Sequence, residues 1–223
     1  MAVPFRIKIC GITNPADASQ AARLGADAIG LNFYPRSPRY VDPDSARRIT
    51  EGLASTLEVI GVFVNQCLVE MTEVASRVGG LRTLQVHGEN DELADPSPFQ
   101  LVLAYPVADR DSLNAVTSRL KRYQDEGWQP AAVLVDAEVV GSYGGTGRQA
   151  PWELLADFKP AVPIILAGGL DPDNVAKAIR IVQPYGVDVA SGVERAPGIK
   201  DNDKMKRFID NARAARDKLG SQA

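Results

Sequence analysis

The chain has 223 residues, of which 45% are hydrophobic, which is enough for a sizeable core in a single domain. Its 25 lysines and arginines against 28 acidic residues give a net charge of −3, and no basic stripe is available for nucleic acid. The sequence opens without a basic and apolar leader, and no apolar run approaches the roughly 20 residues of a membrane span. We therefore expect a cytoplasmic protein without nucleic-acid or membrane partners.

Short β-rich runs alternate with helical patterns along the chain, which is typical of repeated β-α-β units and a parallel sheet. The predicted strands cover residues 6–10, 28–33, 59–64, 83–87, 101–105, 132–136, 164–167 and 187–190. The predicted helices cover residues 15–24, 43–53, 68–78, 111–123, 152–158, 172–182 and 203–219. The connection 88–99 is too rich in proline for more than about one helical turn. Eight units indicate a single-domain (β/α)8 barrel over residues 1–223, whereas an open doubly wound sheet usually has about five or six strands.

Side-chain caps mark three of the predicted helix starts. Asn14, Asp42 and Asp171 each precede a proline. Each therefore offers an oxygen to the free amides of a first turn, followed by a residue suited to the first helical position. We expect a helix to begin at each of these prolines.

The first strand places two reactive side chains on one face. Two isoleucines alternate with Lys8 and Cys10, and the isoleucines belong under the helices, so Lys8 and Cys10 should point into the barrel. A buried lysine needs a partner. The eighth strand closes against the first, and Asp188 lies between two valines on it. We predict an ion pair between Lys8 and Asp188.

Cys10 is interpreted as a reactive thiol rather than as a small buried hydrophobe, because it ends a strand beside Gly11 and close to a cation. A free thiol has a pKa of about 8.5, and Lys8 should increase the thiolate fraction. The other cysteine, Cys67, lies at a predicted helix start and is expected to be structural. Two cysteines are too few for a disulfide framework, and both should stay reduced.

Polar side chains also follow the second and fourth strands. Arg36 and Arg39 lie on a proline-stiffened loop, where they could bind a carboxylate through paired hydrogen bonds or could simply be solvated. His87, the single histidine, ends the fourth strand on the same face as Gln85. A hydrogen-bonded wall of a pocket is at least as good an interpretation of His87 as a catalytic role.

Asp136 ends an otherwise apolar sixth strand and is followed by a glycine-rich loop over residues 143–147. Position alone makes the carboxyl equally well a solvated loop opener or an active-site acid. The loop lacks the lysine and serine of a nucleotide-binding P-loop. We interpret it as a flap over the substrate, with a flexible surface turn as the alternative.

Glycine-containing loops follow the last two strands, with Gly168 and Gly169 in one and Ser191 and Gly192 in the other. Glycines let a backbone approach an anion closely, and these two loops form the phosphate site of many parallel barrels. The pattern predicts a small phosphorylated substrate. Simple turn glycines are the alternative.

Together these segments resemble the phosphoribosylanthranilate isomerases, which perform an Amadori rearrangement in tryptophan biosynthesis. The resemblance lies in a Lys-x-Cys-Gly-Ile-Thr opening, a Gln-x-His-Gly segment and a Ser-Gly-Val-Glu segment at matched places. Further matching segments extend it over nearly the whole chain: residues 25–30, 33–41, 61–65, 144–147, 168–174 and 187–198.

The resemblance implies an isomerase on a barrel of the ribulose-phosphate-binding type, with Cys10 as general base and Asp136 as general acid. It also implies that Arg39 binds the anthranilate carboxylate, with Arg36 as second choice. The expected substrate-binding residues are Arg39, His87, Gly168, Gly169, Asp188, Ser191 and Gly192.

Two positions depart from the commonest family pattern. Ala137 stands where the family often has a threonine near the acid, and Ala190 stands where it often has a serine near the phosphate. Neither change touches the proposed proton transfers. The first strand has no aspartate at the corresponding position, so we do not expect the related isomerisation of the histidine pathway.

The expected reaction needs no cofactor, because the substrate nitrogen is its own electron sink, and no residue spacing indicates a metal site. A monomer is favoured, with a homodimer as the alternative. Other hypotheses are a different phosphosugar enzyme, such as indole-glycerol-phosphate synthase or triosephosphate isomerase, and a noncatalytic barrel that senses a phosphorylated ligand.

Overall fold

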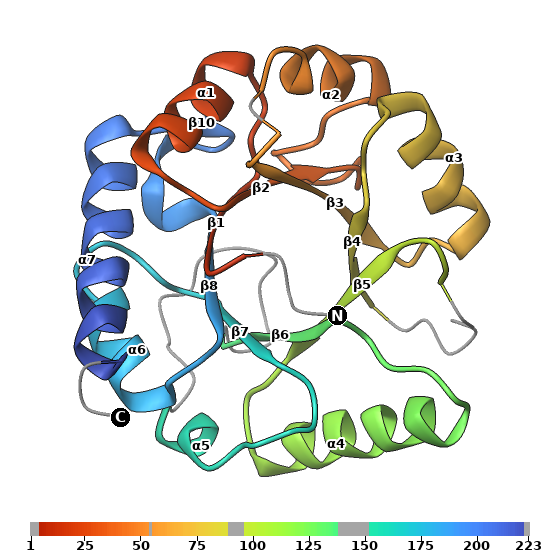
Figure 1. Cartoon of the computed structure of the whole chain (residues 1–223), viewed down its shortest axis with the longest axis vertical. Coiled ribbons are helices and arrows are strands. Elements are labelled where there is room, and N and C mark those ends of the chain that lie inside the picture. Colours follow the sequence, from red (N-terminus) through yellow and green to blue (C-terminus); the bar gives the residue numbers. More distant parts are fainter. Residues whose placement is uncertain (1–4, 54, 89–95, 138–151, 221–223) are drawn as a thin grey trace.

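The computed structural model describes residues 5–53, 55–88, 96–137 and 152–220. Eight parallel strands close into a barrel in chain order, and the helices surround it (Figure 1). The strands are β1 (Ile7–Cys10), β2 (Ala28–Asn32), β3 (Glu58–Val64), β4 (Thr83–His87), β5 (Gln100–Pro106), β6 (Ala132–Asp136), β7 (Ile164–Ala167) and β8 (Gly186–Val189). The predicted (β/α)8 barrel is confirmed, and each predicted strand end lies within one residue of the observed end.

The outer layer consists of the helices α1 (Pro15–Leu24), α2 (Pro43–Thr50), α3 (Leu68–Val78), α4 (Arg110–Asp125), α5 (Trp152–Ala156), α6 (Val175–Val182) and α7 (Asn202–Gly220). The connection between β4 and β5 contains no helix in its described residues, as the prolines predict. Within the described ranges, no helix is both long and apolar enough to cross a membrane.

The predicted caps hold at two helices and fail at the third. Asn14 and Asp42 accept hydrogen bonds from backbone amides in the first turns of α1 and α2. Helix α6 begins at Val175 rather than at Pro172, so that prediction is wrong. The Asp171 carboxylate instead accepts from the amides of residues 173 and 174, which closes a turn ahead of the helix.

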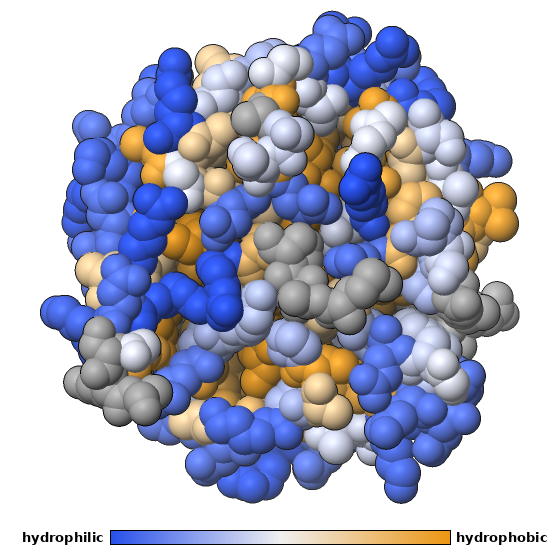
Figure 2. All heavy atoms as spheres, in the orientation of Figure 1, coloured by the Kyte–Doolittle hydropathy of each residue, from blue (hydrophilic) through white to orange (hydrophobic). Residues whose placement is uncertain are grey.

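The hydrophobic core has two layers, because successive side chains of a strand point to opposite faces. The outer layer packs between strands and helices and includes Ile7 and Ile9. The inner layer fills the barrel and consists of Phe5, Ala28, Ile60, Val102, Ala104, Ala132, Leu134, Ile165 and Ala167. Around the rim in Figure 2 hydrophilic side chains dominate, with hydrophobic ones visible between them nearer the middle.

A short two-stranded hairpin follows β8 and was not predicted from the sequence. It consists of β9 (Glu194–Ala196) and β10 (Ile199–Lys200), and the 3-10 helix η1 (Ser191–Val193) connects it to β8. The hairpin matters because it carries Glu194 and Lys200, two buried charged residues, to the end of the barrel at which β1 and β8 finish.

Candidate active site

Cys10 is the last residue of β1 and lies buried on the barrel's inner face, at 8% exposure. Its register partner on β2 is Gly30. A Cβ at Gly30 would lie 2.7 Å from Cys10 Sγ and 3.0 Å from Lys8 Cε, both too close for ordinary contacts. Glycine at this position therefore makes the room that the thiol and the lysine side chain occupy.

Lys8 is completely buried and makes two hydrogen bonds across the barrel interior. Its Nζ donates to Asp188 Oδ2 at 2.9 Å and to Gln85 Oε1 at 2.8 Å. The predicted ion pair with Asp188 is thus confirmed. Burial alone would lower the pKa of Lys8, but the attraction of Asp188 and Cys10 outweighs burial and leaves that pKa above its ordinary value. Lys8 is therefore a permanent cation beneath the thiol.

The pKa of the Cys10 thiol is raised, mainly by burial and then by the negative charge of Asp188. Lys8 and Lys200 act in the opposite direction. The expectation that Lys8 favours the thiolate is therefore right in sign, but burial and Asp188 outweigh it. Cys10 is therefore a neutral thiol at neutral pH.

Gln85 extends the polar chain from Lys8 to His87. Gln85 is buried, and its Nε2 lies 2.7 Å from His87 Nε2. Burial, and then the positive charge of Lys8, lower the pKa of His87 to about 4. His87 is consequently a neutral imidazole at physiological pH.

Asp136 is the last residue of β6 and is half-buried. It shares a strand face with Ala132 and Leu134, which belong to the inner layer of the core. The carboxyl therefore starts on the barrel's inner face, at the same carboxyl-terminal end as Cys10, with β7 and β8 between their strands. The predicted glycine-rich flap at 143–147 lies outside the described residues.

Arg39 is held by Glu194, a contact that the sequence does not reveal. Arg39 Nε and Nη2 donate to the two Glu194 oxygens at 2.8 and 2.7 Å. Lys200, whose side chain is fully buried, donates to Glu194 Oε1 at 2.8 Å and to the Ala190 carbonyl at 3.0 Å. Together these cations overcome burial and hold the pKa of Glu194 below its usual value.

Glycine at position 11 brings the Arg39 side chain close to the strand that carries Cys10. Gly11 follows Cys10, has φ of 72°, and a Cβ there would collide with Arg39 Cδ. Arg36, the second choice for binding a carboxylate, is exposed. The structure thus places Arg39, rather than Arg36, against the end of β1.

The two predicted phosphate loops lie against each other. Gly168 and Gly169 after β7 have φ of 83° and 60°. Gly192 lies in η1 after β8, and a Cβ there would overlap the Leu170 carbonyl oxygen. Only glycine fits at position 192 without moving one loop away from the other.

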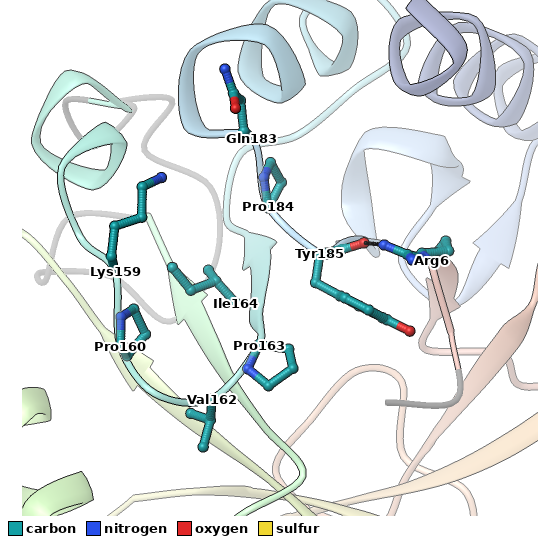
Figure 3. A pocket seen from close by; sticks show the side chains of 9 residues that line it. All are labelled: Arg6, Lys159, Pro160, Val162, Pro163, Ile164, Gln183, Pro184 and Tyr185. Atoms are coloured by element: carbon teal, nitrogen blue, oxygen red, sulfur yellow. Dashed lines mark hydrogen bonds between the residues drawn. The ribbon is translucent and has the colours of Figure 1, made fainter. Parts of the chain in front are cut away.

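A pocket of about 380 Å³ lies at the opposite end of the barrel, among residues that precede β1, β7 and β8. Arg6 and Tyr185 form one wall, with the Arg6 guanidinium over the Tyr185 ring and bonded to its carbonyl (Figure 3). None of the predicted site residues lines this pocket. No group of three or more candidate metal ligands occurs within the described ranges.

Comparison with known proteins connects this geometry to one family. The family model described as N-(5'phosphoribosyl)anthranilate (PRA) isomerase matches residues 7–211. An N-(5'-phosphoribosyl)anthranilate isomerase of Magnetococcus marinus is 44% identical over 225 residues, covering 96% of this chain and 98% of the relative.

Solved structures agree with the sequence relatives. The phosphoribosyl anthranilate isomerase of Thermotoga maritima is 36% identical, with a TM-score of 0.84 over 94% of this chain and 99% of that one. Another structure from that organism is of monomers generated from the dimeric enzyme. A further isomerase, 35% identical with a TM-score of 0.78 and coverage of 94% and 99%, was solved with reduced 1-(o-carboxyphenylamino)-1-deoxyribulose 5-phosphate.

Proposed function

The chain belongs to the N-(5'-phosphoribosyl)anthranilate isomerase family, the isomerases of tryptophan biosynthesis, and from this premise we propose that Cys10 and Asp136 transfer the protons of the Amadori rearrangement. The observation that carries the proposal is positional. Cys10 and Asp136 are each the last residue of their strand, and both occupy inward-facing positions at one end of the barrel. Both side chains can therefore reach one substrate from different sides.

The reaction begins with opening of the ribose ring of N-(5'-phosphoribosyl)anthranilate. Asp136 in its acid form gives a proton to the ring oxygen while the C1–O bond breaks and the nitrogen lone pair forms a C=N bond. The cationic Schiff base acidifies the proton on C2. Cys10 thiolate takes that proton, the C2–H electron pair forms the C1=C2 bond of an enolamine, and the C=N π pair returns to nitrogen. The C2 hydroxyl proton is then lost and C1 gains one, which gives 1-(2-carboxyphenylamino)-1-deoxyribulose 5-phosphate.

The raised pKa of Cys10 is compatible with its role as the base. The productive form, with a protonated Asp136 and a Cys10 thiolate, holds the same number of protons as a thiol with a carboxylate. The two forms therefore interconvert without a change in pH. Lys8 and Lys200 favour the thiolate, and so does the cation that forms on the substrate.

Asp188 and His87 are proposed to bind the sugar. Asp188 Oδ2 is bonded to Lys8, whereas its buried Oδ1 has no hydrogen-bond partner within the described ranges. A buried carboxylate oxygen without a donor is costly, and a ribose hydroxyl would supply the missing donor. Asp188 raises the pKa of Cys10, so its carboxylate lies close to the proposed base.

Arg39 is proposed to bind the anthranilate carboxylate. A guanidinium has five N–H donors, and two of them bind Glu194. In the proposed complex, the Arg39 guanidinium keeps its two bonds to Glu194 and also binds the substrate carboxylate. Glu194 and Lys200 then serve to hold the guanidinium in one orientation over the end of β1.

The phosphate is proposed to bind backbone amides around Gly168, Gly169, Ser191 and Gly192. The two loops meet at Gly192, and positive φ at the two glycines after β7 turns the backbone sharply there. Amides of both loops can thereby converge on one anion. Ala190 has no hydroxyl to donate to the phosphate, so in this proposal backbone amides bind the phosphate at this position.

A monomer is the proposed assembly. In the described ranges only Tyr40, Val69 and Ile199 are large hydrophobic residues with substantial exposure, and single exposed apolar residues are normal on a monomer. Size-exclusion chromatography with light scattering tests this proposal, and a stable dimer at micromolar protein would overturn it.

The catalytic roles are tested by mixing protein with freshly generated substrate and following the loss of its fluorescence. Cys10→Ala and Asp136→Asn should each reduce turnover by at least about 10²-fold. Cys67→Ala is the matched control, since Cys67 is the exposed cysteine at the start of α3, and its turnover should be unchanged. Near-normal turnover in folded Cys10→Ala or Asp136→Asn would remove that residue from the mechanism.

A further inference from the structure

Gln85 connects the charged pair under Cys10 to His87, and none of the roles above uses it. Its Oε1 accepts from Lys8 Nζ at 2.8 Å, and its Nε2 lies 2.7 Å from His87 Nε2. Gln85 is 2% exposed. A buried chain of hydrogen bonds thus runs from Asp188 on β8 through Lys8 on β1 to Gln85 and His87 on β4.

The direction of each hydrogen bond in this chain is fixed by chemistry. An ammonium group has donors only, so the Gln85 atom that faces Lys8 must be the amide oxygen. The amide nitrogen then faces His87, and an amide nitrogen only donates. His87 Nε2 must therefore accept, and in a neutral imidazole that accepts at Nε2 the proton resides on Nδ1.

We infer that Gln85 is a positioning residue that holds His87 in the neutral, Nδ1-protonated form, so that His87 presents an N–H donor to the mouth of the barrel. Nε2 points to Gln85, one inward position deeper in β4, and the Nδ1 N–H diverges from that direction, so this donor is directed away from Gln85. No hydrogen-bond partner for Nδ1 is found in the described part of the chain.

The electrostatic surroundings favour the same state. Burial, and then the positive charge of Lys8, lower the pKa of His87, so both oppose an imidazolium. Asp188, the negative charge of this hydrogen-bonded chain, is separated from His87 by Lys8 and Gln85. The Lys8 ammonium therefore has two effects on His87. It orients the Gln85 amide, and its positive charge disfavours a second proton on the His87 imidazole.

The neutral, Nδ1-protonated form of His87 limits what His87 can do in the proposed reaction, and its role in substrate binding rests on that proposed function. A ring that accepts at Nε2 and donates at Nδ1 cannot remove a proton from the substrate, so Cys10 remains the base. His87 instead supplies one donor for a substrate oxygen, which is a role in binding. Its loss should appear chiefly in KM, by about threefold to tenfold for one neutral hydrogen bond.

The single histidine of the chain makes the test direct. Protein labelled with 15N-histidine gives one imidazole, whose two nitrogen shifts report which nitrogen carries the proton. We expect an Nδ1–H form without substrate, unchanged from pH 8 to below the ordinary histidine pKa of about 6.5. An Nε2–H form, or titration near the ordinary value, would overturn the inference. Neither result depends on the catalytic roles of Cys10 and Asp136.

Gln85→Glu tests the part that Gln85 plays. A carboxylate at this position accepts from Lys8 and also from His87, so the proton should move to Nε2 and the pKa of His87 should rise. Gln124→Glu on the exposed face of α4 adds the same charge far from the barrel and should leave the histidine signals unchanged. Unaltered signals in folded Gln85→Glu would show that Gln85 does not set the tautomer.

Two substitutions of His87 separate a donor at Nδ1 from a role for Nε2. Asparagine places its amide nitrogen near the position of Nδ1, whereas glutamine reaches toward that of Nε2. His87→Asn should retain a KM within about threefold of the wild type, and His87→Gln should raise KM by more than that. The reverse order would overturn the donor role even if the tautomer is as inferred.

Discussion

Lys8 Nζ lies 2.9 Å from Asp188 Oδ2, at paired register positions of β1 and β8, and both side chains are shut away from solvent. The strands that bring them together are the first and last of the barrel. The ion pair therefore connects β1 to β8, the two strands whose pairing closes the barrel. It also sets the charge beneath Cys10, because Lys8 lowers the thiol pKa and Asp188 raises it.

Breaking this pair should destabilise the fold. Lys8→Met leaves the Asp188 carboxylate buried without its cation, which typically costs about 3–5 kcal/mol of unfolding free energy. Urea denaturation measures the loss. The double variant Lys8→Met with Asp188→Leu removes both charges and should recover more than half of it. A double variant as unstable as the sum of the two single variants would show that the two charges do not stabilise each other.

An exposed pair provides the control for that experiment. Arg47 and Glu51 lie one helical turn apart with a separation of 3.8 Å, and both are mostly exposed. Arg47→Ala should change the unfolding free energy by less than about 0.5 kcal/mol. A comparable loss in this variant would mean that the Lys8 result does not reflect burial.

The pH dependence of turnover should show the raised thiol pKa. The productive and resting forms of Cys10 and Asp136 share one proton, so activity declines on the alkaline side only when the shared proton is lost. That decline should therefore lie above the ordinary thiol pKa of about 8.5. The measurement is kcat/KM against pH in a Cys67→Ser background. Thiolate absorbance in the same protein gives the Cys10 pKa directly, and a titration below the ordinary value would contradict the prediction.

The barrel and the polar seam could be predicted from the sequence because they follow from local patterns. Alternation of apolar residues fixes which side chains of β1 and β8 point inward, and closure of eight strands then pairs Lys8 with Asp188. The start of α6 was missed because Asp171 suits a cap and a turn equally well. The hydrogen bonds from the amides of residues 173 and 174 to its carboxylate show that Asp171 closes a turn here, and the sequence does not reveal these bonds.

The support of Arg39 could not be predicted, because it depends on contacts between distant segments. Glu194 and Arg39 are 155 positions apart, and the hairpin that carries Glu194 has strands of only three and two residues. No periodicity appears over such short runs. The Ser-Gly-Val-Glu segment contains Glu194 but does not indicate a contact with Arg39, and Lys200 carries no sequence signal of its own.

Glu194→Gln should weaken both the fold and the binding of substrate. The substitution removes the negative charge that pairs with both Arg39 and buried Lys200. We therefore expect a loss of about 3 kcal/mol in unfolding free energy and a higher KM. The pKa of Glu194 is lowered in the folded protein, so its stabilisation is present above the ordinary glutamate pKa of about 4.3 and fades below it. The difference from the wild type should shrink as the pH falls through that region. Urea denaturation at several pH values measures it, and a difference that grows on acidification would refute the role of Glu194.

Gly192→Ala should separate the two loops proposed to bind phosphate. The added methyl group would overlap the Leu170 carbonyl oxygen, a backbone atom that cannot rotate away, so one loop must move. Positions of the converging amides matter steeply, since a displacement of about 1 Å can reduce catalysis by 10²-fold. We therefore expect a marked rise in the KM for substrate and in the dissociation constant for inorganic phosphate. Gly220→Ala, where no described atom lies within 4 Å of the added methyl, should change neither constant. If Gly192→Ala unfolded like the wild type and bound phosphate equally well, the anion would have to be held elsewhere than at the junction of these loops.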